Sequence, residues 1–328
     1  LNAEGDWVVQ SKPDWCSLSA MSGSKKTELT LTVQEMAKGA SDRSGDIVFK
    51  LNNKDYTTKC TISQYNYEYA EDQVISLQNH SNGNGVNLVF LGDGFDAKDI
   101  SDGTYMKDIK LQVENFFAIE PYKTYRSYFN VYTAIPVSLE SGIGNVNTIK
   151  YSKFGTNYSS GSGLICDNDA VFSYALKMPT VTKSNLNKSL IVLIPNSTDY
   201  GGVTEMWDDG SAISICPLST FSYPLDTRGV LQHEAGGHGF GKLGDEYIYY
   251  NSFINDNSQA LSCFNHAKSL GWYQNLSATG KRNEVPWSHL LYNSRYSDIV
   301  DIFEGGYFYT RGIYRSEANS CMNNDVPY

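Results

Sequence analysis

Two of the five histidines in this chain of 328 residues lie within six positions of each other. They are His233 and His238, and Glu234 directly follows the first. Asp226 or Thr227 is a suitable N-cap for a helix that would carry all three side chains. Two neutral imidazoles and a carboxylate on one helix are the groups with which a zinc hydrolase binds its metal and activates water. The segment therefore predicts a helix with a metal site, and the rest of the fold must accommodate it.

The spacing of the two histidines is unusual for a metal-binding helix. In His-Glu-x-x-His the histidines are four residues apart, a rotation of about 400°, so the rings nearly align. His233 and His238 are five apart, about 500°, which leaves them roughly 140° out of register on a regular α-helix. A π-bulge would bring both onto one face, and Gly236 and Gly237 make that distortion easier. The sequence therefore predicts a π-type turn between Glu234 and His238.

Acidic residues follow this helix at a distance from which the chain can turn back toward the histidines. Gly241 predicts a left-handed C-cap, and Asp245 and Glu246 come soon after it. These residues resemble the active-site motif of the metallopeptidase family typified by the clostridial IgA peptidase. That motif runs His-Glu-x-Gly-His, a short turn with a glycine, and then Asp-Glu-Tyr. The matching residues, with one extra residue between Glu234 and His238, are Gly237-His238, Gly241 and Asp245-Glu246-Tyr247.

The resemblance extends beyond the histidines, over residues 85–328. It includes a loop after a buried strand, a Pro-Tyr pair, a further strand and a Glu-Ser-Gly turn, at Gly92–Phe95, Pro121–Tyr122, Phe129–Tyr132 and Glu140–Gly142. The family is a zincin family similar to the metzincins. The resemblance therefore implies a catalytic domain with a mixed sheet and an active-site helix.

The resemblance also implies roles for the residues of the site. His233 and His238 would bind Zn2+, with Asp245 as the favoured third protein ligand and Glu246 in reserve. Glu234 would take a proton from the attacking water and later deliver it to the leaving amine.

Three features of the last part of the chain concern the same site. The run Ser320–Met322 resembles the methionine turn under the zinc of metzincin-like peptidases, and an ordinary core methionine is the alternative. Tyr314 or Arg315 would then polarise the oxyanion. His266 or His289 could replace a ligand if the unusual histidine pair failed, and ordinary core or surface histidines are the alternative.

The first part of the chain predicts a small β-sandwich. Short strands are expected at 29–33, 47–51 and 56–62, separated by Ser, Gly, Asn and Asp turns. The region resembles the BACON-type domain of secreted gut-bacterial proteins, through Trp15, Arg43–Gly45 and Thr61–Gln64. Such domains are linked to carbohydrate or mucin binding, and a spacer is the alternative role.

These observations define the expected architecture, an α+β or α/β chain. An Ig-like, BACON-like sandwich over 1–68 precedes a linker over 69–85 and a zincin-type catalytic domain over 86–328. In that domain we expect buried strands at 86–91 and 189–195 and helices near 104–117 and 167–177. A strand at 211–215 is either the edge along which substrate aligns or an ordinary edge strand.

Composition and the start of the chain indicate which partners and which location to expect. The net charge of −10 disfavours nucleic acid and anionic membranes as partners. No apolar run approaches the roughly 20 residues of a membrane span. The chain starts with neither an initiator Met nor a signal peptide, so a processed start is expected. We expect a bacterial protein that is secreted or lies at the cell surface or in the periplasm. The six cysteines form no Cys-x-x-Cys pair, and disulfides and free thiols are both open.

The sequence as a whole predicts a secreted zinc endopeptidase acting on polypeptide or glycoprotein, with carbohydrate contact through the N-terminal domain. One alternative is a catalytically dead zincin scaffold that binds glycan or protein. A second alternative is a zinc-dependent hydrolase of glycan or mucin.

Overall fold

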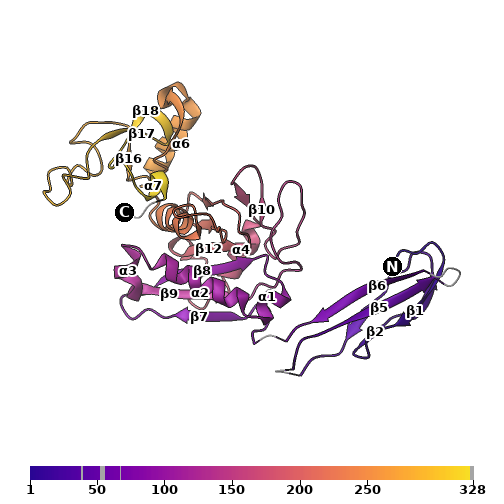
Figure 1. The fold of residues 1–328 in the computed structure, drawn as a ribbon. Coiled ribbons are helices and arrows are strands. Elements are labelled where there is room, and N and C mark those ends of the chain that lie inside the picture. Colours follow the sequence, from indigo (N-terminus) through magenta and orange to yellow (C-terminus); the bar gives the residue numbers. More distant parts are fainter. Residues whose placement is uncertain (38–39, 52–55, 67, 326–328) are drawn as a thin grey trace. The chain divides into compact units, whose positions relative to one another are not determined.

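The computed structural model describes residues 1–37, 40–51, 56–66 and 68–325, and the chain divides into two compact units (Figure 1). The first unit is Leu1–Tyr69 and the second is Ala70–Tyr328. The segment 69–85, which the sequence predicted as a linker, contains a strand of the second unit, β7 (Val74–Gln78).

The first unit is a β-sandwich, as the sequence predicted. Its larger sheet is antiparallel, with the order β3 (Ser22–Ser24), β1 (Asp6–Ser11), β5 (Arg43–Leu51) and β6 (Thr57–Gln64). A second sheet pairs β2 (Cys16–Leu18) with β4 (Leu31–Val33). Alternate residues of β1 and β5 point inward and meet Cys16 of the second sheet, so that the two sheets share a core of Trp7, Val9, Cys16, Ile47 and Phe49.

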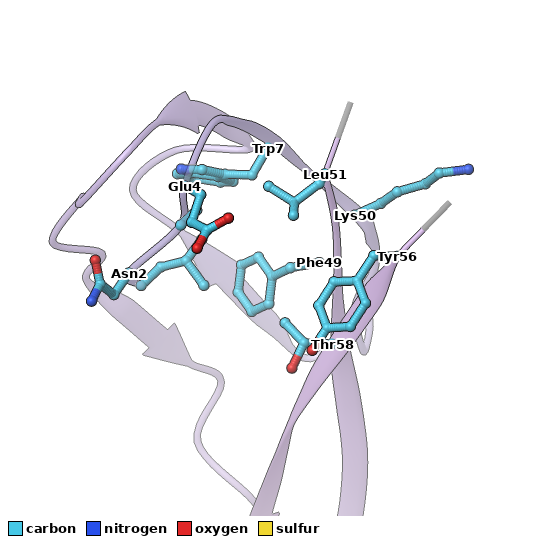
Figure 2. Close-up of a pocket in the computed structure, with 10 residues that line it drawn as sticks. Asn2, Glu4, Trp7, Phe49, Lys50, Leu51, Tyr56 and Thr58 are labelled. Carbon is cyan, nitrogen blue, oxygen red and sulfur yellow. The ribbon is translucent and has the colours of Figure 1, made fainter. Parts of the chain in front are cut away.

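A pocket of about 380 Å³ opens on the first unit (Figure 2). Three of the ten residues of its wall are aromatic, namely Trp7, Phe49 and Tyr56. Trp7 is buried in the core, whereas Tyr56 is 60% exposed. Glu4 and Thr58 add polar groups to the same wall. This pocket supplies an aromatic surface that the sequence alone did not indicate.

The second unit is built on a six-stranded mixed sheet. Its order is β13 (Val203–Met206), β14 (Ala212–Ile215), β12 (Leu190–Pro195), β8 (Val86–Asp93), β9 (Phe129–Ala134) and β7. The four inner strands are parallel, and β13 and β7 are antiparallel to their neighbours. The inner strands are buried along nearly their whole length, which explains their continuous apolar sequences.

The strand predicted at 211–215 is not an edge strand. It forms β14, which lies between β12 and β13, and all four of its residues are buried. The edge on this side is β13, whose residues are all partly exposed. The error arose because β13 is short and follows a glycine-rich turn, so its sequence gave no strand pattern.

Helices cover the sheet, and a smaller sheet lies in the last part of the chain (Figure 1). The α-helices outside the site are α1 (Ala97–Ser101), α2 (Thr104–Phe116), α3 (Tyr122–Tyr125), α4 (Asn168–Ala175) and α6 (Ser258–Ser269). The smaller sheet contains β15 (Ile248–Phe253), β16 (Leu276–Ser277), β17 (Phe303–Gly306) and β18 (Phe308–Arg315). A hairpin pairs β10 (Asn157–Tyr158) with β11 (Leu164–Ile165), and single 3₁₀ turns lie at Arg126–Tyr128, Leu186–Lys188 and Ile254–Asp256.

All six cysteines are free thiols, so the disulfide alternative is not observed. Within the described ranges, no helix combines the length and apolar character that crossing a membrane requires.

Candidate metal centre

The helix predicted from the sequence has the widened geometry that the histidine spacing requires. It begins as α5 (Thr227–Leu231), capped by Asp226, whose carboxylate accepts from Gly229 N. The chain then continues without a break as a π-helix, η3 (Gln232–Phe240). The predicted π-type turn is confirmed, and it extends over the whole second half of the helix.

The glycines of η3 are required by close contacts as well as by the widening. A Cβ on Gly236 would lie 3.0 Å from the Tyr122 ring, and one on Gly237 would lie 2.1 Å from Met322 Sδ. A Cβ on Gly239 would lie 2.5 Å from Ser214 Oγ of the sheet. Three separate elements therefore approach the backbone between and beyond the histidines.

The helix end differs from the prediction. Gly241 is the C-cap, but it has right-handed backbone angles, with φ −74°. The following Lys242 takes the left-handed conformation, with φ 51°. A Cβ on Gly241 would lie 2.9 Å from Gly237 O, so close packing and not a left-handed φ favours glycine there.

Met322 lies directly against the segment between the two histidines. It belongs to α7 (Cys321–Asn324), which is capped by the Ser320 hydroxyl and contacts η3. Met322 is completely buried, and its Sδ occupies the space that a side chain at Gly237 would need. This placement under the histidine pair agrees with the methionine-turn interpretation.

The structure brings His233, His238 and Asp245 together. Each imidazole Nε2 lies 3.1 Å from Asp245 Oδ1, and the two ring centroids are 4.8 Å apart. The three ligand atoms all lie within 4.8 Å of one another. Ligand atoms of a tetrahedral zinc site are about 3.3 Å apart, given metal–ligand distances of about 2.0–2.1 Å. The cluster can therefore hold a metal ion with small side-chain movements.

The other nitrogen of each ring is held by a backbone carbonyl. His233 Nδ1 lies 2.9 Å from Cys321 O, and His238 Nδ1 lies 2.7 Å from Leu243 O. A carbonyl only accepts, so each Nδ1 carries a proton, and Nε2 is the nitrogen with which each ring would bind a metal. His233 Nδ1 also lies 2.9 Å from Asp325 Oδ1, so this ring has a carboxylate partner in addition.

Each Nε2 donates to Asp245, and a metal ion would take the place of these two protons. Burial raises the pKa of Asp245, but hydrogen bonds from His233 and His238 outweigh burial and hold the pKa well below its ordinary value. Burial lowers the pKa of both imidazoles, but their hydrogen bonds to Asp245 raise it above the ordinary value, with Asp325 adding to this for His233. Asp245 is therefore an ionised carboxylate, as a metal ligand must be.

Glu234 lies beside the ligand cluster and faces a cavity. Its Oε2 accepts from Thr204 Oγ1 of β13 at 2.8 Å. Its Oε1 faces Gly202, where a Cβ would lie only 2.9 Å away. Burial raises the pKa of Glu234 above its ordinary value, although the two nearby imidazoles and Thr204 act in the opposite direction.

The cavity has a volume of about 520 Å³. Besides His233 and Glu234, its wall comes from the turn before β13, the segment before α5, the start of β15 and the C-terminal turn. These segments contribute Tyr200, Gly202, Leu225, Tyr247, Tyr249 and Asp325 to the wall. The ring of Tyr247 also stacks on His233, with centroids 6.1 Å apart.

Several other predicted site residues lie elsewhere. Glu246 is buried and accepts from Ser320 Oγ at 2.7 Å and from Asn275 Nδ2 at 2.9 Å, so it supports the fold. The Tyr314 hydroxyl donates to Glu304 Oε1 at 3.4 Å, and among the described residues it is not part of the cavity wall.

The reserve ligands and Arg315 are also placed away from the cluster. His266 Nε2 pairs with Asp208 at the surface, 3.0 Å away, and His289 is exposed. Arg315 Nη1 donates to Gly305 O at 2.7 Å.

Sequence reasoning missed three groups that the fold brings to the site: Asp325, Thr204 and the tyrosines at 200, 247 and 249. A role for Tyr247 at the site could have been predicted, because this residue follows the Asp-Glu pair of the motif. Asp325 and Thr204 carried no local signal, since neither belongs to a patterned segment.

Comparison with known proteins agrees with this geometry. The sequence profile of the IgA peptidase M64 family matches residues 75–295, which is more than half of the chain. The profile of the BACON domain, an N-terminal binding domain, matches residues 5–65. No curated protein matches the chain. The profile match spans both histidines, Glu234 and Asp245. The chain therefore belongs to the IgA peptidase M64 family of metallopeptidases and carries an N-terminal BACON domain.

Proposed function

We propose that this chain is a secreted, zinc-dependent endopeptidase. The observation that carries the proposal is the position of Asp245 Oδ1, 3.1 Å from the Nε2 atoms of both His233 and His238, beside the Glu234 carboxylate. Three protein ligands and one open position are the composition of catalytic zinc sites. Zinc, when bound, supplies a Lewis acid that lowers the pKa of a coordinated water toward ~7.

Glu234 acts as the general base and then as the general acid. Its carboxylate takes the proton of the attacking water and later delivers it to the leaving amine. Thr204 holds Oε2 at 2.8 Å, which orients the carboxylate so that Oε1 faces the cavity at Gly202. The raised pKa of Glu234 favours the second step, because a glutamic acid that keeps its proton more readily can donate it at a higher pH.

The substrate is a polypeptide that binds in extended form along β13. This strand is the free edge of the sheet, and its Thr204 contacts Glu234 directly. A peptide that adds to the edge would therefore pass beside the base, with its backbone groups paired to the strand. The tyrosines of the cavity would contact a side chain next to the cleaved bond. Tyr314, whose hydroxyl contacts Glu304, keeps its proposed oxyanion role only if substrate binding moves β18.

Two features support contact with an extracellular glycoprotein. The chain contains 24 tyrosines and 13% aromatic residues, a composition common in extracellular proteins that meet polymers. The pocket on the first unit offers the exposed ring of Tyr56, on which a sugar could stack (Figure 2). We propose that the BACON domain contacts carbohydrate there and that the peptidase domain cleaves the protein.

The decisive experiment is digestion of a proteome-derived peptide library by the wild type and by Glu234→Gln, with and without a chelator. We expect cleavage inside peptides that the chelator abolishes and added zinc restores. Glu234→Gln should bind one zinc ion and lose hydrolysis by about 10²–10⁴-fold, since the contribution of a general base is lost.

The alternatives give different results in the same experiment. A dead scaffold would bind metal without cleaving any peptide. A glycan hydrolase would cleave a glycan panel and leave the peptides intact. Wild-type turnover by Glu234→Gln would remove Glu234 from the mechanism.

A further inference from the structure

Hydroxyl groups from outside the helix donate to carbonyl oxygens within η3. The Tyr122 hydroxyl donates to Gly236 O at 2.6 Å. Thr204 Oγ1 and Ser214 Oγ donate to Glu234 O at 2.9 Å and 3.1 Å. Both carbonyls belong to the segment that separates the histidines, where the helix must be wide.

These donors hold the segment from two sides. Glu234 O faces the sheet, where Thr204 and Ser214 lie on β13 and β14. Gly236 O faces the start of α3, where Tyr122 lies. The wide segment is therefore clamped between the sheet and α3.

Tyr122 is a rigid donor. It is 5% exposed, and its ring packs on Phe116 and Phe240 with centroid distances of 4.4 Å and 5.5 Å. The absence of a side chain at Gly236 lets the ring approach the helix backbone, where a Cβ would lie 3.0 Å from it. Gly236 O also accepts the π-helical bond from Gly241 N at 3.0 Å. The hydroxyl therefore binds the same oxygen that closes the wide turn.

This contact discriminates between two helix geometries. An α-helical turn would rotate the Gly236 carbonyl away from Tyr122 and leave a buried hydroxyl without its acceptor, which is unfavourable. The same α-helical turn would place the two imidazoles roughly 140° apart. A group that stabilises the wide turn therefore also stabilises the arrangement in which both imidazoles reach Asp245.

We propose that Tyr122 is a positioning residue for the candidate metal centre. Its hydroxyl holds the π-helical turn at Gly236 and so keeps His233 and His238 on one face. Tyr122 acts through the helix backbone, not through a contact with the ligands or with Glu234. The proposal rests on the proposed function, because it assigns the turn a role in metal binding.

The test is the zinc affinity of the full chain with Tyr122→Phe, measured by competition with a chromophoric chelator. This change keeps the buried ring and removes only the hydroxyl. We expect the dissociation constant for zinc to rise about threefold to tenfold, the factor that corresponds to the loss of one neutral hydrogen bond. An affinity within twofold of the wild type would overturn the proposal.

Tyr105→Phe is the matched control. Tyr105 is also buried, and its hydroxyl also donates to a backbone carbonyl, at Ala134, but that carbonyl belongs to β9 and not to η3. It additionally bonds Thr133 and Gly92, so its removal lowers stability at least as much. We expect its zinc affinity to stay within twofold of the wild type. An equal loss of affinity in both variants would show a general effect of stability and would overturn the specific role of Tyr122.

A second measurement separates this proposal from the proposed function. Amide hydrogen exchange of the metal-free chain reports the turn directly, without zinc or catalysis. We expect faster exchange at residues 237–241 in Tyr122→Phe and not in Tyr105→Phe. If the wild type bound no zinc but this difference appeared, the proposed function would fail and the role of Tyr122 in the turn would stand. Unchanged exchange would reject that role.

Discussion

Replacement of Asp325 by Asn should weaken zinc binding without unfolding the chain. Asp325 Oδ1 lies 2.9 Å from His233 Nδ1 and is the carboxylate partner of that ring. The residue has left-handed backbone angles, φ 57° and ψ 16°. Asn adopts this conformation nearly as readily as Asp, so the substitution adds little backbone strain. The change therefore removes a charge and leaves the shape of the turn intact.

The expected size of the effect follows from what remains at the ring. His233 Nδ1 keeps the Cys321 carbonyl at 2.9 Å, and the Asn side-chain oxygen can still accept. What is lost is the charge assistance, which roughly doubles the strength of such a bond. Loss of a partner that supports a metal ligand costs about 10–100-fold in affinity, and we expect the lower end, about tenfold or 1.4 kcal/mol.

Chelator competition at constant pH measures this effect, with thermal unfolding of the metal-free chain as the check on folding. Asn324→Ala is the control, because Asn324 is an exposed residue of the same turn whose side chain donates to Asn319 Oδ1. Wild-type affinity in Asp325→Asn, or an equal loss in the control, would refute the assignment of Asp325 as the partner of His233.

Two further predictions concern the architecture and the pH dependence. The fragment 70–328 should fold and bind zinc alone, because the first unit supplies no ligand and has its own core; a fragment that is insoluble or free of metal would contradict this. The acid limb of kcat/KM should lie above pH 4.5, which is the ordinary pKa of a glutamate. The pKa of Glu234 is raised, so its carboxyl group stays protonated, and inactive as a base, up to a higher pH. A pH profile with its limb at or below 4.5 would show that Glu234 is not the base, or that its pKa is not raised.

The parts of the fold that the sequence predicted are those with a strong local pattern. The continuous apolar runs of β8 and β12 and the periodicity of α2 were sufficient to place these elements. The strands β7 and β13 were missed because they are short and partly exposed, and their pairing partners are distant in the sequence. An edge strand is defined by its neighbours, which local patterns do not report.

The candidate site shows the same division. The three candidate ligands and the π-type turn could be proposed from one short segment, through its histidine spacing and its resemblance to the family motif. The supporting groups did not, since Tyr122 and Gly236 are 114 positions apart and Thr204 and Glu234 are 30 apart. The position of Tyr314 also depends on residues outside its own segment. The pairing of β18 with β17 places its hydroxyl near Glu304, and local sequence does not report that pairing.

The extra residue in this helix has a physical consequence for how such sites can vary. One residue inserted in an α-helix rotates everything after it by about 100° and would carry His238 away from His233. Here the wider π geometry absorbs that rotation within η3, so that the turn at Gly241 and the Asp245 carboxylate still return to the first histidine. The widening alone would leave an exposed, weakly held backbone. The approach of Tyr122, Met322 and Ser214 to the three glycines fills the space around it. In this helix the longer spacing between the histidines is therefore accommodated by the π geometry together with close packing on its three glycines.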